Sequence, residues 1–165
     1  MIYIIPTGGL CNYLRVVFSY NEYAKSINEK LTVIWNVTEI CNGFYLDYFE
    51  AVPNITFLKS KPDNVEIHYK GSGVCTKNGI KGANYSDLIL LPHMREKIKK
   101  NIKVIGDNYI AIHIRRTDHT RTFKDRKPLT EDEDFIDFID NTKDSNLYIA
   151  TDNANTFNKF KSKYS

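Results

Sequence analysis

Apolar and polar residues alternate along the chain between short strand-like runs and amphipathic helical stretches. Ile2–Ile5 predicts a buried strand, which the break Pro6-Thr7-Gly8-Gly9 ends. From Asn12 to about Lys30, apolar residues recur near a helical period, at Leu14, Val17, Phe18, Tyr20, Ala24 and Ile27. Leu31–Trp35 predicts a second strand. This order of strand, glycine loop, helix and strand indicates a βαβ unit whose strands lie parallel.

The middle of the chain carries shorter patterns. Phe44–Glu50 is typical of a short amphipathic helix, and Ile55–Leu58 and Val65–Tyr69 are strand candidates. Pro92 opens a stretch in which Met94, Ile98 and Ile102 have helical spacing. A set of aromatic residues is interpreted as core rather than as a stacking platform for a ligand: Trp35, Phe44, Tyr45, Tyr48 and Phe49.

The second half repeats the strand and helix alternation. Asn108–Ile114 has the strongest strand pattern, and Asn146–Ala150 predicts a further strand. Thr130 and Glu133 have capping-box spacing at the start of one helix, and another is expected from Ala154 to about Lys163. The fold class is therefore α/β, Rossmann-like, with a mostly parallel sheet and flanking helices. We expect one Rossmann-like unit over residues 1–105 and a partial second unit over 106–165.

Composition narrows the possible classes of function. Of the 165 residues, 42% are hydrophobic and 13% aromatic, which is ample for a packed core. The net charge of +3 gives little reason to expect nucleic-acid or membrane-surface binding. Cys11, Cys41 and Cys75 lack CxxC spacing, so neither a zinc site nor a disulfide framework is indicated. No signal peptide or membrane-spanning run is visible, and a cytoplasmic location is expected.

The first candidate site is the glycine turn Gly8-Gly9-Leu10-Cys11-Asn12 between a strand and a helix. Glycines let backbone amides approach an anion closely, and a helix N-terminus adds its positive dipole. The turn matches neither a dinucleotide fingerprint nor a Walker loop. A tight turn that needs positive φ explains the glycines equally well, and Asn12 could be a helix N-cap.

The second candidate site is His113, Arg115, Arg116 and Asp118, where the strongest strand ends. A planar guanidinium suits a carboxylate or a diphosphate, and ligands of open α/β sheets gather beyond the carboxyl ends of strands. Alternation puts His113 and Arg115 on the opposite face from Ile112 and Ile114. The alternative is structural: an ion pair of Arg115 or Arg116 with Asp118, and His113 as a hydrogen-bonded core residue. His113 and His119 lack metal-site spacing, and no metal is expected.

The third candidate site is Ala150-Thr151-Asp152-Asn153, between a strand and a helix. Asp152 could accept hydrogen bonds from a base or a ribose, and backbone amides of this turn could hold a phosphate. The alternative is that Asp152 is simply the N-cap of the helix.

The three sites occur in the order GGLCNYLR, AIHIRRTD and YIATDN. This order resembles the fucosyltransferase-like glycosyltransferases, which include the α1,6-fucosyltransferases, nodulation fucosyltransferases and protein O-fucosyltransferases. Trp35, Cys41-Asn42-Gly43-Phe44 and Asp47-Tyr48-Phe49 also look like segments of this group. The middle motif is the specific one.

The resemblance implies a GT-B arrangement in which two Rossmann-like domains hold GDP-fucose in a cleft. It implies metal-independent, inverting transfer to a glycan, with a GDP-sugar as donor substrate and no other cofactor. Arg115 and Arg116 would hold the diphosphate beside His113, and Asp118 would order the arginine loop. The nucleotide-sugar would also contact Thr151 and Asp152, and Gly8, Gly9 and Asn12 would face the same cleft.

The sequence departs from the family in two places. A glutamate expected near Phe123 is missing, and Asp118, His119 and Asp125 are the possible substitute bases. The family also continues past the ATDN-like motif, so we expect a fragment or a C-terminally shortened relative. A non-catalytic nucleotide- or glycan-binding domain is the alternative function, and a phosphate-ester enzyme is a third. The acceptor, the sugar and the oligomeric state stay open.

Overall fold

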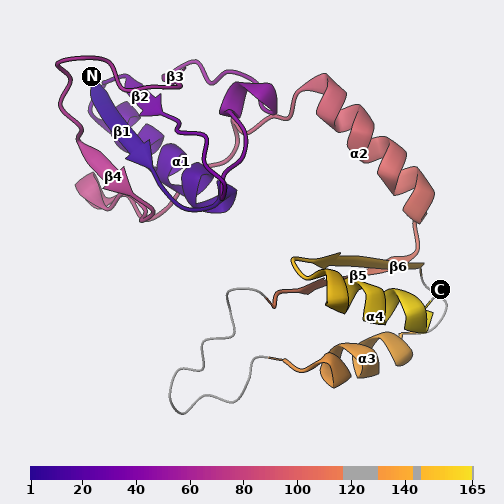
Figure 1. The fold of residues 1–165 in the computed structure, drawn as a ribbon. Helices are drawn as coiled ribbons and strands as arrows, with labels where there is room; N and C mark the ends of the chain where they lie inside the picture. Colours follow the sequence, from indigo (N-terminus) through magenta and orange to yellow (C-terminus); the bar gives the residue numbers. More distant parts are fainter. Residues whose placement is uncertain (117–129, 143–145, 165) are drawn as a thin grey trace, which may run out of the picture. The chain divides into compact units, whose positions relative to one another are not determined.

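Parallel strands flanked by helices make up the structure, a computed structural model that describes residues 1–116, 130–142 and 146–164 (Figure 1). The described chain divides into a unit Met1–Arg95 and a unit Glu96–Ser165, each with its own core. The predicted α/β class with a parallel sheet is confirmed. Within the described residues, no helix combines the length and apolar character needed to cross a membrane.

The first unit is built on a parallel sheet with the strand order β3-β2-β1-β4. Its strands are β1 (Ile2–Pro6), β2 (Leu31–Ile34), β3 (Ile55–Leu58) and β4 (Tyr69–Gly71). Helix α1 (Leu10–Ser26) connects β1 to β2, as the predicted βαβ unit requires. Two short 3-10 turns, η1 (Tyr45–Asp47) and η2 (Lys77–Gly79), complete the unit before α2 (Pro92–Ile105).

The core of the first unit forms where α1 packs on the sheet. The buried face of the helix carries Tyr13, Val16, Val17, Phe18, Tyr20 and Ala24. The predicted core position of Trp35 is confirmed, because it is 1% exposed and its Nε1 donates to the carbonyl of Gly43 at 2.7 Å. Tyr45 stacks on Phe57 with ring centroids 3.9 Å apart. Burial of these large rings is a main source of stability for a small domain.

Two short elements differ from the prediction. The expected helix Phe44–Glu50 is only the turn η1, because Glu50 N–H and Leu91 N–H bond across to the carbonyls of Ile89 and Tyr48. The expected strand Val65–Tyr69 has the wrong bounds, because β4 spans Tyr69–Gly71, the residues that pair with β1. In both places, tertiary pairing overrides the local pattern.

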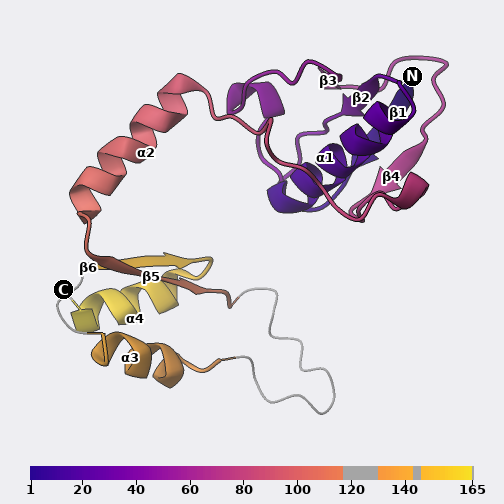
Figure 2. The ribbon, with the colours of Figure 1, turned by 180° about the vertical axis from the view of Figure 1, so that it is seen from behind.

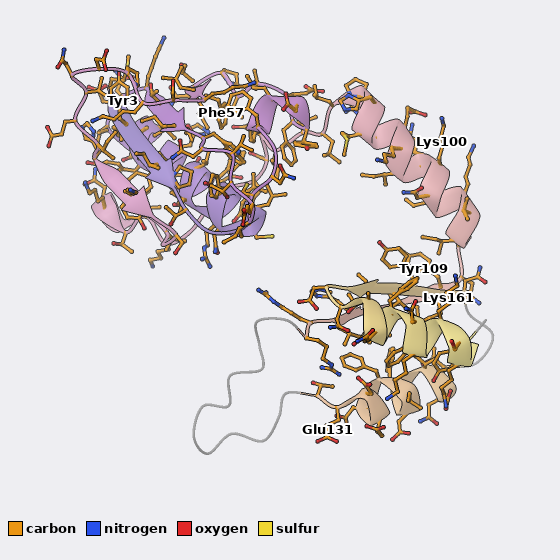
Figure 3. All side chains as sticks on the ribbon, viewed as in Figure 1. Tyr3, Phe57, Lys100, Tyr109, Glu131 and Lys161 are labelled. Carbon is orange, nitrogen blue, oxygen red and sulfur yellow. The ribbon has the colours of Figure 1, made fainter. Side chains whose placement is uncertain are left out.

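The second unit holds β5 (Tyr109–Ile114) and β6 (Asn146–Thr151), which pair in parallel. Helices α3 (Asp132–Asp140) and α4 (Ala154–Tyr164) lie on one side of these strands in both opposite views (Figures 1 and 2). That side buries Ile112, Ile114, Ile139 and Phe160. The opposite face exposes Tyr109 and Tyr148 by 45% and 47%, and Figure 3 shows Tyr109 pointing away from α3 and α4.

The predicted helices α2, α3 and α4 are confirmed, but the N-cap residue of α3 differs from the prediction. In α2 every residue is at least partly exposed, including Ile98 and Ile102. The N-cap of α3 is Glu131 instead of Thr130, and Glu131 N–H donates to Asp134 Oδ2 at 2.8 Å. Thr130 has a φ of 26°, whereas Glu131 has the extended backbone that an N-cap requires.

One buried hydroxyl yields a test of this core. Among the described residues, the Tyr45 hydroxyl is buried without a hydrogen-bond partner, and burial raises its pKa to about 12. We expect Tyr45→Phe to raise the free energy of unfolding by about 1 kcal/mol, because an unsatisfied buried hydroxyl is costly. Tyr13→Phe should lower it by about 1 kcal/mol, because the Tyr13 hydroxyl donates to the carbonyl of Asn36 at 3.0 Å. Urea unfolding measures both variants, and destabilisation by Tyr45→Phe would contradict the assignment.

Candidate functional site

The register of β5 and β6 brings two of the three predicted motifs together. Ile114 pairs with Thr151, the last residue of β6. The segments that follow the two strands therefore leave the sheet at the same edge, with Arg115 and Arg116 beside Asp152. Arg116 N–H donates to Asp152 Oδ1 at 2.8 Å, which joins the two strand exits directly. The carboxyl edge of a parallel sheet is where ligands bind in open α/β folds.

Arg116 is held by its side chain as well as by its backbone. Its Nη2 donates to Asp132 Oδ1 at 2.7 Å, and its Nη1 donates to the carbonyl of Thr130 at 3.1 Å. The guanidinium carbon lies 5.7 Å from the centroid of the Phe135 ring, within range of a cation–π contact. The structural alternative named Asp118 as an ion-pair partner, but Asp118 lies outside the described residues; Asp132 is the carboxylate that the structure pairs with Arg116.

Asp132 and Lys159 are polar partners that the sequence analysis missed. Lys159 Nζ donates to Asp132 Oδ2 at 2.7 Å, so each carboxylate oxygen accepts from a different cation. The hydrogen bond from Arg116, followed by that from Lys159, lowers the pKa of Asp132. The hydrogen bond to Asp132 raises the pKa of Lys159. The sequence marks Asp132 only as an acidic residue in the first turn of a helix, a position that also favours it through the helix dipole.

The turn after β6 caps the helix that follows it. Asn153 Oδ1 accepts from Thr156 N–H at 2.9 Å and from Thr156 Oγ1 at 3.2 Å. Thr151 Oγ1 accepts from Asn153 N–H at 3.2 Å. The interpretation of Asp152 as the N-cap is therefore wrong: Asn153 caps α4, and the Asp152 carboxylate reaches across to β5.

A pocket of about 540 Å³ opens beside this turn. It is lined by Ile149, Ala150, Thr151, Asp152, Asn153, Ala154 and Phe157. Phe157 is 42% exposed, which is unusual for an aromatic ring on a helix that packs against a sheet. The sequence analysis also missed Phe157, because helical spacing alone does not separate a ring that lines a pocket from one in the core.

His113 lies on the face of β5 that α3 and α4 leave open, and Arg115 is the first residue after the strand. His113 is exposed, so its alternative interpretation as a hydrogen-bonded core residue is wrong. Arg115 is also exposed. The candidate bases Asp118, His119 and Asp125 lie outside the described residues, so the structure places none of them.

The glycine turn belongs to the first unit. Gly8 has a φ of 91°, and a Cβ on it would lie 2.6 Å from Asn12 Nδ2, so the turn requires glycine there. The N-cap of α1 is Gly9, and the interpretation of Asn12 as the cap is wrong. Instead, Asn12 Oδ1 accepts from Arg15 Nη2 at 2.8 Å, and the same nitrogen donates to the carbonyl of Ser72 at 3.0 Å. Arg15 is a further cation that the sequence analysis did not single out.

The described residues, 1–116, 130–142 and 146–164, contain no candidate metal site. Such a site would need three or more histidine, cysteine, aspartate or glutamate side chains placed to hold one ion. Cys11 is exposed, and Cys41 and Cys75 are buried free thiols.

The fold is similar to those of solved fucosyltransferases. A NodZ α-1,6-fucosyltransferase co-crystallised with GDP matches with a TM-score of 0.56 and 12% identity, over 99% of this chain and 76% of that chain. NodZ α-1,6-fucosyltransferase soaked with GDP-fucose matches with a TM-score of 0.55 and 11% identity, over 99% and 75%. Fucosyltransferase NodZ from Bradyrhizobium matches with a TM-score of 0.54 and 11% identity, over 99% and 76%. No protein-family model and no curated protein sequence matches the chain. The likeness therefore establishes a fucosyltransferase-like fold.

The cap of α4 can be tested independently of any ligand. We expect Asn153→Ala to lower the free energy of unfolding of the second unit by about 1 kcal/mol, because Thr156 N–H loses its acceptor. Asn153→Asp should retain most of the stability, because a carboxylate accepts the same bond and suits the helix dipole. Thermal melts followed by circular dichroism compare the two variants, and equal loss in both would show that the cap contributes little.

Proposed function

We propose that this chain transfers a sugar, with fucose as the preferred candidate, from a GDP-sugar to a glycan hydroxyl. The observation that carries the proposal is the meeting of Arg115, Arg116 and Asp152 at the carboxyl edge of a parallel sheet, next to a pocket. The fold supports it, because the matching structures include fucosyltransferases studied with GDP and with GDP-fucose. The motif order found in the sequence adds independent support.

The chemistry of sugar transfer explains why cations belong at this edge. The acceptor oxygen forms a bond to C1 of the sugar while the bond from C1 to the β-phosphate oxygen breaks. The bonding electron pair stays on the β-phosphate, so negative charge grows on the departing GDP. Preorganised guanidinium groups stabilise that charge in the transition state, and loss of one such donor commonly costs about 10²- to 10³-fold in rate.

The proposed roles follow from this chemistry. Arg115 and Arg116 supply the positive charge for a metal-independent, inverting reaction, with His113 and Thr151 beside the nucleotide-sugar. The proton of the acceptor hydroxyl passes to a carboxylate or an imidazole, for which Asp118, His119 and Asp125 are the candidates. Asp118 also orders the arginine loop. In the first unit, Gly8, Gly9 and Asn12 are proposed to contact the donor.

The pocket beside Phe157 accounts for the base of the nucleotide. An aromatic ring that is 42% exposed at a pocket wall offers a flat apolar surface on which guanine can stack. Ile149 and Ala150 extend this apolar wall, and the polar turn Thr151–Asn153 lies at its end. A nucleoside diphosphate would then run from an apolar wall to the arginine pair.

The proposal predicts a response to GDP that depends on Arg115. GDP at about 100 times its Kd should stabilise the protein by about 2.7 kcal/mol, measured by scanning calorimetry. GDP-fucose should be hydrolysed slowly, and Arg115→Ala should lower this rate by about 10²- to 10³-fold and weaken the GDP response. Arg95→Ala is the matched control, because the Arg95 side chain forms an exposed ion pair with Glu50 at 3.4 Å and belongs to none of the candidate motifs. Stabilisation by GDP without turnover would favour a nucleotide-binding domain, and no response would reject both functions.

A second prediction concerns the ring at the pocket wall. Phe157→Ala should weaken GDP binding about tenfold, because base stacking on an aromatic ring contributes roughly 1–3 kcal/mol. Phe157→Tyr should preserve the affinity. Phe138→Ala is the control, because Phe138 is 52% exposed on α3 and does not line the pocket. Isothermal titration calorimetry measures the Kd, and an unchanged Kd in Phe157→Ala would place the base elsewhere.

A further inference from the structure

Helix α2 carries an apolar stripe that belongs to neither core. Met94, Ile102 and Ile105 all fall within about 40° of Ile98 around the helix axis, because each residue of an α-helix advances by about 100°. We call these four residues the α2 stripe. Ile98 and Ile102 are 41% and 45% exposed. In the described parts of the chain, α1, α3 and α4 each bury apolar side chains in a core, whereas no residue of α2 joins either core.

The rest of the surface of α2 is strongly basic. The helix carries a single acidic residue, Glu96, against five cations, which are Arg95, Lys97, Lys99, Lys100 and Lys103. The net charge of the whole chain is only +3, so more than the entire excess of positive charge lies on this one helix. The small net charge of the chain therefore conceals a concentrated basic surface, which the expectation drawn from overall charge overlooked.

Ion pairs within the protein leave most of this charge available. Lys99 Nζ lies 3.0 Å from Glu96 Oε1, in a pair whose two side chains are both exposed. Such exposed pairs contribute little energy and exchange readily with other partners. Within the ranges that the structure describes, three lysines of the helix form no ion pair: Lys97, Lys100 and Lys103. Figure 3 shows Lys100 extending outward from the helix.

The length of α2 determines how it can meet a lipid bilayer. Its 14 residues extend about 21 Å, whereas a helix needs about 20 predominantly apolar residues to cross the hydrocarbon layer. A short helix with one apolar face and a lysine-rich remainder lies instead in the plane of the membrane surface. Its apolar face enters the boundary with the acyl chains, and the long lysine side chains reach the headgroups.

The charge of α2 separates the possible partners of the stripe. Pairing with α2 of a second copy would bring five cations against five, and like charges on facing helices repel. Binding to the phosphates of a nucleic acid would satisfy the cations but leave the stripe in water. A bilayer with anionic headgroups matches both features at once, because it offers negative charge above an apolar layer.

We propose that α2 binds the surface of a membrane that contains anionic lipids. The α2 stripe enters the boundary between headgroups and acyl chains, and the lysines beside it contact the anionic headgroups. This interaction goes beyond the sugar transfer proposed above and does not depend on it.

Cosedimentation of the full chain with vesicles tests the proposal. The protein should pellet with extruded vesicles of phosphatidylcholine and phosphatidylserine in a two-to-one ratio. It should stay in the supernatant with vesicles of phosphatidylcholine alone. Raising sodium chloride from about 0.1 M to about 1 M should release the protein, because the screening length falls from about 10 Å to about 3 Å.

Variants of the stripe test its apolar role. Ile98→Ala should lower the partition coefficient on the mixed vesicles about tenfold, because three carbon atoms leave the apolar face. Alanine also retains the helix, so the change removes apolar surface alone. Val104→Ala is the matched control. Val104 is 86% exposed on the same helix but lies about 120° from Ile98, so its truncation should leave the partition coefficient unchanged.

Variants of the cations test the electrostatic role. Lys97→Gln should lower the partition coefficient on the mixed vesicles about fivefold, because each basic residue near an anionic surface contributes to binding. Lys30→Gln removes the same charge from an exposed position of the first unit and should leave the partition coefficient nearly unchanged. Equal losses in both variants would show that only the overall charge matters and would overturn the role of α2.

The remaining outcomes also decide the proposal. A folded wild-type protein that does not pellet with the mixed vesicles, or that pellets equally well with phosphatidylcholine alone, would overturn it. If Ile98→Ala lowers the Tm without vesicles by more than about 5 °C, the stripe packs inside the protein and the proposal fails. Analytical ultracentrifugation without vesicles gives the last check. A dimer that Ile98→Ala dissociates would assign the stripe to a second copy and would also overturn the proposal.

Discussion

Parallel pairing of Tyr109–Ile114 with Asn146–Thr151 sets the position of the described candidate residues at the strand exits of the second unit. Because the strands are in register, the arginine pair and the Thr151–Asn153 turn leave the sheet together. The buried side chains Ile112 and Ile114 hold the pair of strands against α3 and α4 through Ile139 and Phe160. A slip by one residue would exchange these isoleucines with His113 and Arg115, which the core could not accept. Apolar burial therefore fixes the place at which the polar groups meet.

Several polar side chains near the two strand exits form hydrogen bonds within the protein. Asp152 joins the two strand exits, Asn153 caps α4, and Asp132 binds two cations at once. A site that must hold a charged ligand needs such supporting contacts, because a loosely held guanidinium would lose much of its advantage to reorganisation.

The sequence predicted those parts of the fold that depend on local pattern. The apolar runs of β1, β2, β3, β5 and β6 and the helical spacing of α1 and α2 are visible from single segments. Elements that depend on a distant partner were predicted less well: η1 is short because its flank pairs with Ile89 and Leu91, and β4 begins where β1 allows it. The candidate site shows the same division. Arg115, Arg116 and Asp152 were singled out from their motifs. Asp132 and Lys159 were missed, because Asp132 lies 16 positions from Arg116 and 27 positions from Lys159 in the sequence.

The buried indole of Trp35 has a practical consequence. It is the sole tryptophan in the sequence, and it lies in the core of the first unit with its ring N–H bonded to Gly43. Its intrinsic fluorescence therefore reports on the environment of that unit and is silent about the other one. Loss of its buried emission during denaturation would follow the first unit alone, while the second unit, which contains no tryptophan, would need a different optical probe. Comparison of this fluorescence with a probe of the second unit would therefore show whether the two cores unfold together or separately.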